Sequence, residues 1–168
     1  RYLGFRSLRS RGDKASNFVF KQLDDANKWI AARAVWLLPY IGSQGIDACI
    51  KMLEDENSDQ RVVAYRSLRR AGHDMIPHAR RMCKDKSSQV RREIALSLRD
   101  LPAEKTKDIF IELAKRCDTT DKNSLEAIGL GAAKQESIIW RAIKNELHPD
   151  SSDQWSDHFA RLTWRLWG

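Results

Sequence analysis

Apolar side chains recur along this chain at the spacing of amphipathic helices. Between residues 58 and 83 they form two sets, first Val62, Tyr65 and Leu68, and then Ile76, Ala79 and Cys83. Steps of three and four residues place each set on one face of a helix. Gly72 stands between the sets, and glycine commonly ends a helix because it tolerates the left-handed backbone conformation. The segment is therefore predicted to form two short helices joined by a turn.

The same pattern returns every 30 residues. Equivalent positions carry large apolar residues at Leu8, Leu38, Leu68 and Leu98, turn-forming residues at Gly12, Gly42, Gly72 and Pro102, and acidic residues at Asp25, Asp55 and Asp85. A single hairpin of about 30 residues cannot bury its apolar face alone, so neighbouring hairpins are expected to stack around one core. No alternating run rich in β-branched residues predicts a strand. We therefore predict an all-α fold, a right-handed α-solenoid of about five helical-hairpin repeats.

The repeats are regular over residues 1–117 and less regular over 118–168. After Cys117 the register slips, and helices are predicted around residues 125–130 and 138–147. A polar break over 148–153 precedes a last helix that carries Phe159, Leu162 and Leu166. No linker divides the chain. We predict a single repeat domain over 1–168 and, because the sequence does not begin with Met, a fragment of a longer chain.

The acidic column resembles the HEAT-repeat family. In that family an Asp in the inter-helix turn is followed six residues later by an Arg, and these residues form a ladder of ion pairs and hydrogen bonds between neighbouring repeats. Two pairs keep this spacing, Asp55 with Arg61 and Asp85 with Arg91. After Asp25 an alanine takes the place of the Arg. The 30-residue unit looks like the short bacterial variety of HEAT repeat, and the resemblance makes the two pairs a structural ladder.

Several segments also resemble the HEAT portion of large multidomain secreted proteins of planctomycetes and Bacteroidetes. Those proteins join a sugar-dehydrogenase-like β-propeller, a HEAT segment and a c-type cytochrome domain. The similar stretches are residues 33–38, 90–102, 121–129 and 164–166. The resemblance implies a periplasmic or secreted location and a redox parent such as a dehydrogenase. It carries no catalytic residue into this chain, which lacks the CxxCH haem site.

Positive charge is concentrated in one part of the chain. The net charge is +7, and residues 61–92 hold ten Lys or Arg and two Asp. Basic residues also repeat on the second helix of the hairpins, which usually lines the concave side of a HEAT stack. The candidate basic surface comprises Lys21, Lys51, Arg80, Arg81 and Lys84. Arg80 stands in a column of Phe20, Ile50 and Phe110, which predicts a local cleft or an altered packing angle. We favour a solvated face over an acidic protein or a neighbouring domain as partner, and place nucleic acid last.

No residue pattern indicates catalysis, a metal or a cofactor. The four His lack ligand spacing, and the three Cys lack a CxxC pair and are interpreted as core residues. No apolar run approaches the roughly 20 residues of a membrane-spanning helix. Trp29 and Trp36 lie in helical patterns and are predicted to be buried. Trp155, Trp164 and Trp167 are predicted to form a packed cap at the end of the array.

These observations favour a non-catalytic scaffold or protein-interaction module in a larger, exported redox protein. Its partners would be neighbouring domains of the same chain or another protein. The alternative is a basic solenoid that binds nucleic acid, similar to HEAT-like DNA glycosylases, although no counterpart of their catalytic Asp can be located. A third reading, a lyase-like HEAT protein that acts on a tetrapyrrole protein, rests on the short repeat alone.

Overall fold

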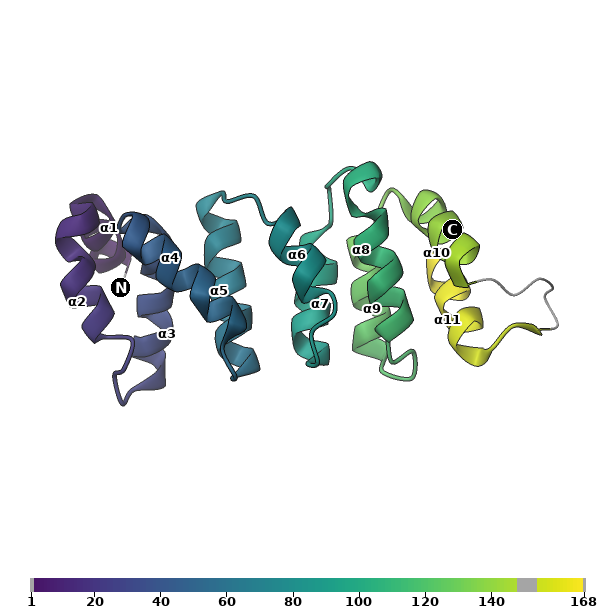
Figure 1. Cartoon of the computed structure of the whole chain (residues 1–168), viewed down its shortest axis with the longest axis horizontal. Coiled ribbons are helices and arrows are strands. Elements are labelled where there is room, and N and C mark those ends of the chain that lie inside the picture. Colours follow the sequence, from purple (N-terminus) through teal and green to yellow (C-terminus); the bar gives the residue numbers. More distant parts are fainter. Residues whose placement is uncertain (1, 148–153, 168) are drawn as a thin grey trace. The chain divides into compact units, whose positions relative to one another are not determined.

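The computed structural model describes residues 2–147 and 154–167, and every regular element in them is helical (Figure 1). The prediction of an all-α fold is confirmed. The predicted break at 148–153 lies outside the described residues. The chain divides into two compact units, Arg1–Met75 and Ile76–Gly168, which are described one at a time. A single repeat domain over the whole chain stays a prediction.

Unit 1 packs its helices in pairs around a small apolar core. The helices are α1 (Tyr2–Arg11), α2 (Ser16–Lys21), α3 (Lys28–Leu37), α4 (Ser43–Lys51) and α5 (Ser58–Ala71), with 3-10 turns at Gly12–Ala15, Leu38–Tyr40 and Met52–Glu54. Helix α3 packs against α1, α2 and α5, and α4 packs against α5. Val35, Leu38, Ile41, Tyr65 and Leu68 are almost fully buried between them. The core therefore lies where the first helices of successive hairpins meet.

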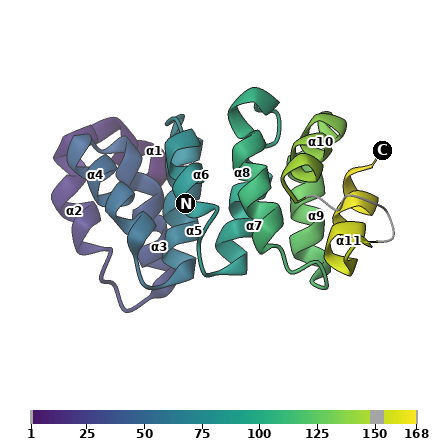
Figure 2. The same ribbon diagram turned by 45° about the vertical axis from the view of Figure 1, so that its right-hand side comes forward.

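Unit 2 has two rows of helices. Its elements are α6 (Ile76–Met82), α7 (Ser88–Ser97), α8 (Ala103–Arg116), α9 (Lys122–Gly131), α10 (Glu136–Leu147) and α11 (Asp157–Leu166). Helices α7, α9 and α11 pack in sequence, and α6, α8 and α10 form the second row (Figure 2). Ile94, Phe110, Ile128 and Ile143 fill the space between the rows. The slipped register after residue 117 therefore still produces a helical pair, α9 and α10, and the predicted final helix is α11.

The turn-forming column has a backbone cause. Gly12, Gly42 and Gly72 have φ values of 52°, 94° and 89°, in the left-handed region that favours glycine. Gly72 ends α5, and its N–H donates to the Arg69 carbonyl while the His73 N–H donates to the Leu68 carbonyl. This pair of bonds is a Schellman motif. In the fourth hairpin the column holds a proline, and the positive φ moves two residues back, to Asp100.

The acidic column also has a local cause. The Oδ1 atoms of Asp25, Asp55 and Asp85 accept hydrogen bonds from the main-chain N–H two residues later, at 2.7, 2.8 and 2.8 Å. Such Asx turns direct the chain into the next helix. Asn57 then caps α5 by accepting from the Asp59 N–H at 2.9 Å. The Asp column therefore marks the entry to the first helix of each hairpin.

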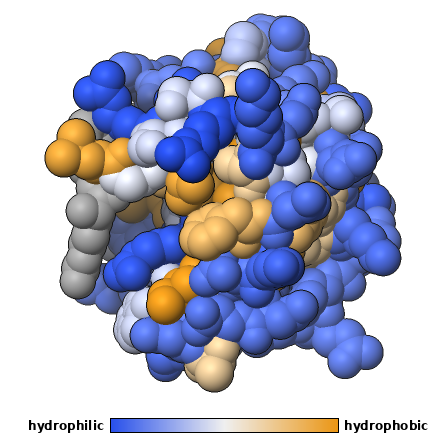
Figure 3. Space-filling model, turned by 90° about the vertical axis from the view of Figure 1, so that its left-hand side faces the viewer, coloured by the Kyte–Doolittle hydropathy of each residue, from blue (hydrophilic) through white to orange (hydrophobic). Residues whose placement is uncertain are grey.

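Two predictions for tryptophan are wrong. Trp29 is 64% exposed, because the buried face of α3 follows Ala31, Ala34 and Val35 and Trp29 lies outside that face. Trp164 is 75% exposed on α11 and does not contribute to a packed cap. Trp155 does pack, with its ring 5.0 Å from that of Phe159. The α1 and α2 end of unit 1 likewise shows hydrophobic side chains surrounded by hydrophilic ones (Figure 3).

Candidate functional site

The ladder residues bind the turns that precede their own helices. Arg61 is 5% exposed, and its Nη1 donates to the main-chain oxygens of Asp55 at 2.7 Å and Glu56 at 3.0 Å. Arg91 repeats this geometry with Asp85 and Lys86, at 2.7 and 3.1 Å. Its Nη2 also donates to the Arg116 carbonyl at 3.2 Å, at the end of α8. Each arginine therefore satisfies carbonyl groups of a turn, and Arg91 joins that turn to the next hairpin.

The candidate basic surface is divided between the units. Lys21 and Lys51 end α2 and α4 in unit 1, whereas Arg80, Arg81 and Lys84 belong to α6 and the turn after it in unit 2. Within unit 2, Arg80 forms an ion pair with Asp108 at 3.2 Å and Lys84 lies 3.9 Å from Glu112. Helix α8 thus supplies carboxylates to part of this set.

A groove lies beside Arg80, between α6 and α8. It has a volume of about 350 Å³ and is lined by both basic and acidic side chains, including Asp108, Glu112, Lys115 and Glu146. Lys115 and Glu146 are paired across it at 2.6 Å. A groove in which cations already have carboxylate partners offers little net charge to a phosphate backbone.

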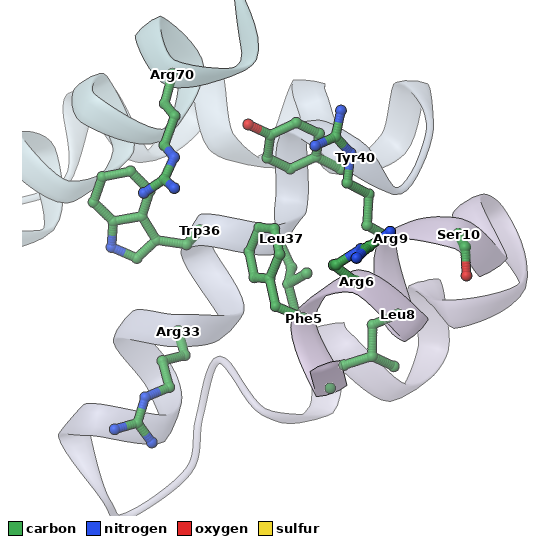
Figure 4. Close-up of a pocket in the computed structure, with 11 residues that line it drawn as sticks. Phe5, Arg6, Leu8, Arg9, Ser10, Arg33, Trp36, Leu37, Tyr40 and Arg70 are labelled. Carbon is green, nitrogen blue, oxygen red and sulfur yellow. The ribbon is translucent and has the colours of Figure 1, made fainter. Parts of the chain in front are cut away.

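The largest described concavity is a cleft of about 930 Å³ in unit 1 (Figure 4). We call it the arginine–aromatic cleft, after the side chains that line it: the rings of Phe5, Trp36 and Tyr40 and the guanidinium groups of Arg6, Arg9, Arg33 and Arg70. Leu8 and Leu37 complete its apolar wall. No carboxylate is among the residues that line it.

Three hairpins of unit 1 bring these side chains together. Phe5 and Arg9 are four residues apart on α1, and Arg33 and Trp36 are three apart on α3, so each pair shares a helix face. Tyr40 follows in the 3-10 turn after α3. Arg70 lies in the last turn of α5, whose end is fixed by the Schellman motif at Gly72.

The corner between α2 and α4 holds the cleft in shape. Ser16, the first residue of α2, is buried, and its Oγ donates to the Ile41 carbonyl at 3.1 Å. At Gly42 a Cβ atom would collide with the Asp13 carboxylate, and φ is positive. The close approach that glycine permits therefore sets the distance between the first hairpin and the turn that carries Tyr40.

Two arginines of the cleft lie over aromatic rings. The Cζ atom of Arg9 is 4.3 Å from the Tyr40 ring centroid, and that of Arg70 is 5.7 Å from the Trp36 ring. The Phe5 ring meets the Tyr40 ring edge to face at 5.8 Å. These contacts are within the range of cation–π attraction. They hold positive charge at the mouth of an apolar cleft.

The cysteines are buried and chemically quiet. Burial raises the pKa of the Cys49 thiol to about 11, although its hydrogen bond with Ser67 acts in the opposite direction. Burial also raises the pKa of Cys117 to about 11. In the described part of the chain no cluster of His, Cys, Asp or Glu could hold a metal ion. No described helix has the length and apolar character needed to cross a bilayer.

Sequence reasoning missed the arginine–aromatic cleft. Its candidate surface drew on charge alone, and none of Lys21, Lys51, Arg80, Arg81 and Lys84 lines this site. A signal was present, since aromatic and arginine residues stand three or four positions apart in 5–9 and 33–36. Only the packing of α1 on α3 shows that these two faces meet.

The helical hairpins, their 30-residue columns and the turn arginines define an all-helical repeat protein. The family model of HEAT repeats matches residues 46–129, half of the chain, from α4 to α9. The chain belongs to the HEAT-repeat family. No curated protein and no solved structure matches it. HEAT repeats commonly mediate protein interaction, and domains built from them are generally non-catalytic.

Proposed function

We propose that this chain is a non-catalytic protein-interaction module that holds a partner polypeptide in the arginine–aromatic cleft. Family membership supports the class of function, and the cleft is the observation that carries the site. A concave, largely apolar surface with a few fixed polar groups is what recognition requires. The proposal includes the stacking of the hairpins as a right-handed α-solenoid of about five repeats in a single domain.

The setting is a further part of the proposal. The module would belong to a larger, exported redox protein, a dehydrogenase, and would bind either a neighbouring domain of the same chain or another protein. Only the resemblance of the segments at 33–38 and 90–102 supports this setting. The reading frame around the chain tests it directly: a β-propeller domain upstream and a CxxCH motif downstream are expected. A frame that encoded neither would contradict it.

Nucleic acid is the less supported partner. Two of the three aromatic rings in the cleft, those of Tyr40 and Trp36, already have a guanidinium group over them. Arg80 and Lys84 in unit 2 face carboxylates of α8. Both observations reduce what a phosphate backbone or an unstacked base would gain.

Site-specific photocrosslinking tests the proposed function in the full-length parent protein, expressed in its own cells. p-Benzoylphenylalanine replaces Trp36 inside the cleft, and the matched control replaces Trp29, which is on the same helix but 64% exposed outside the cleft. Irradiation is expected to join one polypeptide to position 36 and not to position 29. The adduct should disappear when Arg9 and Arg70 are changed to glutamate. Equal labelling at both positions, or an adduct with nucleic acid, would refute the proposal.

A further inference from the structure

We infer that the occupant of the arginine–aromatic cleft is an acidic polypeptide segment in which an apolar residue is flanked by carboxylates on both sides. The inference rests on the proposed function and adds the chemistry of the partner. It depends on three features of the cleft: the sign of its charge, the way its arginines are held, and the position of its apolar wall.

The charge of the cleft is uncompensated. Four arginines and no carboxylate line it. Arg9, Arg33 and Arg70 make no ion pair with any described residue, and all three are exposed. Elsewhere in the chain, by contrast, exposed cations such as Arg80 have acidic partners. A concave surface with one sign of charge attracts a ligand of the opposite sign and disfavours a basic one.

The arginines are held in a form that suits carboxylates. A guanidinium group that lies over a ring keeps its in-plane N–H donors available, and those donors match the two oxygens of a carboxylate. Arg9 over Tyr40 and Arg70 over Trp36 have this arrangement. Since the ring contact already restricts each side chain, binding loses less conformational entropy. The same contacts cover the ring faces on which a nucleobase would stack.

The apolar wall lies between the charged groups. Figure 4 shows Phe5 and Leu37 between Arg70 with Trp36 on one side and Arg9 with Tyr40 on the other. A ligand that reached both arginines would therefore pass over the apolar residues. A volume of about 930 Å³ accommodates several residues of an extended chain rather than one side chain. Acidic, apolar, acidic is the order of side chains that fits this arrangement.

Fluorescence anisotropy with the full 168-residue chain tests the inference. The probe is a labelled nonapeptide with one central leucine between two runs of four glutamates. Matched probes replace the leucine with serine, replace all glutamates with glutamine, or are a labelled single-stranded oligothymidylate of similar charge. The glutamate–leucine peptide should bind most tightly, and its affinity should fall as salt rises, because exposed charges are screened.

Two variants locate the binding. Arg9→Gln and Arg70→Gln should each weaken the glutamate–leucine peptide about tenfold, the loss expected for one charge-assisted contact. Arg141→Gln, an exposed arginine of α10 outside the cleft, is the control and should leave affinity unchanged. Circular dichroism checks that each variant is folded, and because both cleft arginines are exposed no loss of fold is expected.

The results separate the two proposals. Equal binding of the glutamine peptide, tighter binding of the oligothymidylate, or unchanged affinity in Arg9→Gln and Arg70→Gln would overturn the inference. If position 36 still photocrosslinks to a polypeptide in that case, the proposed function stands and the cleft recognises a partner of other chemistry. If neither experiment gives a polypeptide at the cleft, both proposals fail.

Discussion

At the scale of single residues, burial distinguishes arginines that hold the fold from those that can hold a ligand. Arg61 is 5% exposed and gives its donors to two main-chain carbonyls of its own turn. Arg9 and Arg70 are exposed and lie over aromatic rings. The sequence alone separates these roles only for Arg61, since the Asp six residues earlier identifies it. Arg9 and Arg70 carry no such marker.

Arg61→Ala should destabilise the protein by about 2 kcal/mol, because two buried carbonyl groups lose a charged donor. Urea unfolding followed by circular dichroism measures the change. Arg141→Ala, which removes an exposed arginine from α10, is the matched control and should stay within about 0.5 kcal/mol of the parent. A loss no larger for Arg61 than for Arg141 would show that water replaces the donor and that the turn needs no arginine.

The buried thiol of Cys49 predicts a loss of stability in alkaline solution. Its pKa is raised from an ordinary 9.0 to about 11, because burial disfavours the thiolate. The unfolded chain releases this proton near pH 9, so the stabilisation is complete below pH 9 and is lost as pH rises toward 11. Between pH 8 and 10.5 the parent should lose about 2 kcal/mol more than Cys49→Ala, as measured by urea unfolding. An equal loss in both proteins would contradict the assignment to Cys49.

At the scale of helices and turns, the 30-residue columns predicted the fold well, because each column has a local physical cause. The glycine column follows from positive φ values, and the Asp column follows from Asx turns. Leu38, Leu68 and Leu98 are almost fully buried as expected, but Leu8 in the same column is only half-buried. It lies on α1, where it lines the cleft instead of the core.

Helix contacts that exclude a side chain could not be predicted from the columns. Gly131, at the end of α9, lies so close to α7 that a Cβ atom would overlap the Ala95 carbonyl oxygen. Gly4, in the interior of α1, has no atom within 4 Å of the corresponding position. Both are helical glycines in the sequence, and only the packing distinguishes them.

These two glycines predict opposite results of the same substitution. Gly131→Ala should destabilise unit 2 by about 1–3 kcal/mol, because the Ala95 main chain must move. Gly4→Ala should stabilise the protein by about 0.5–1 kcal/mol, since alanine loses less backbone freedom in a helix. Chemical denaturation of the two variants beside the parent gives both values. Stabilisation by Gly131→Ala would mean that α7 and α9 are further apart than described.

At the scale of the whole molecule, the sequence predicted a repeat array but not the cleft. An array needs only that each hairpin resembles the next, and that information lies along the chain. The arginine–aromatic cleft needs α1, α3 and α5 to bring unlike faces together, and no column contains that information. Charge counting pointed to residues 61–92, where many cations have partners within the fold. Net charge alone is therefore a weak guide to a binding site in a repeat protein.

The division into two units predicts that each can fold separately. Residues 1–75 contain every residue of the cleft, and residues 76–168 contain the two helix rows of unit 2. Each fragment, expressed alone, should give a helical circular dichroism spectrum and a cooperative thermal transition. Both transitions should fall below that of the full chain, because small domains bury less surface and repeats stabilise their neighbours. The 1–75 fragment should bind the glutamate–leucine peptide, and the 76–168 fragment should not. An unfolded 1–75 fragment beside a folded full chain would show that unit 1, and its cleft with it, depends on the helices that follow.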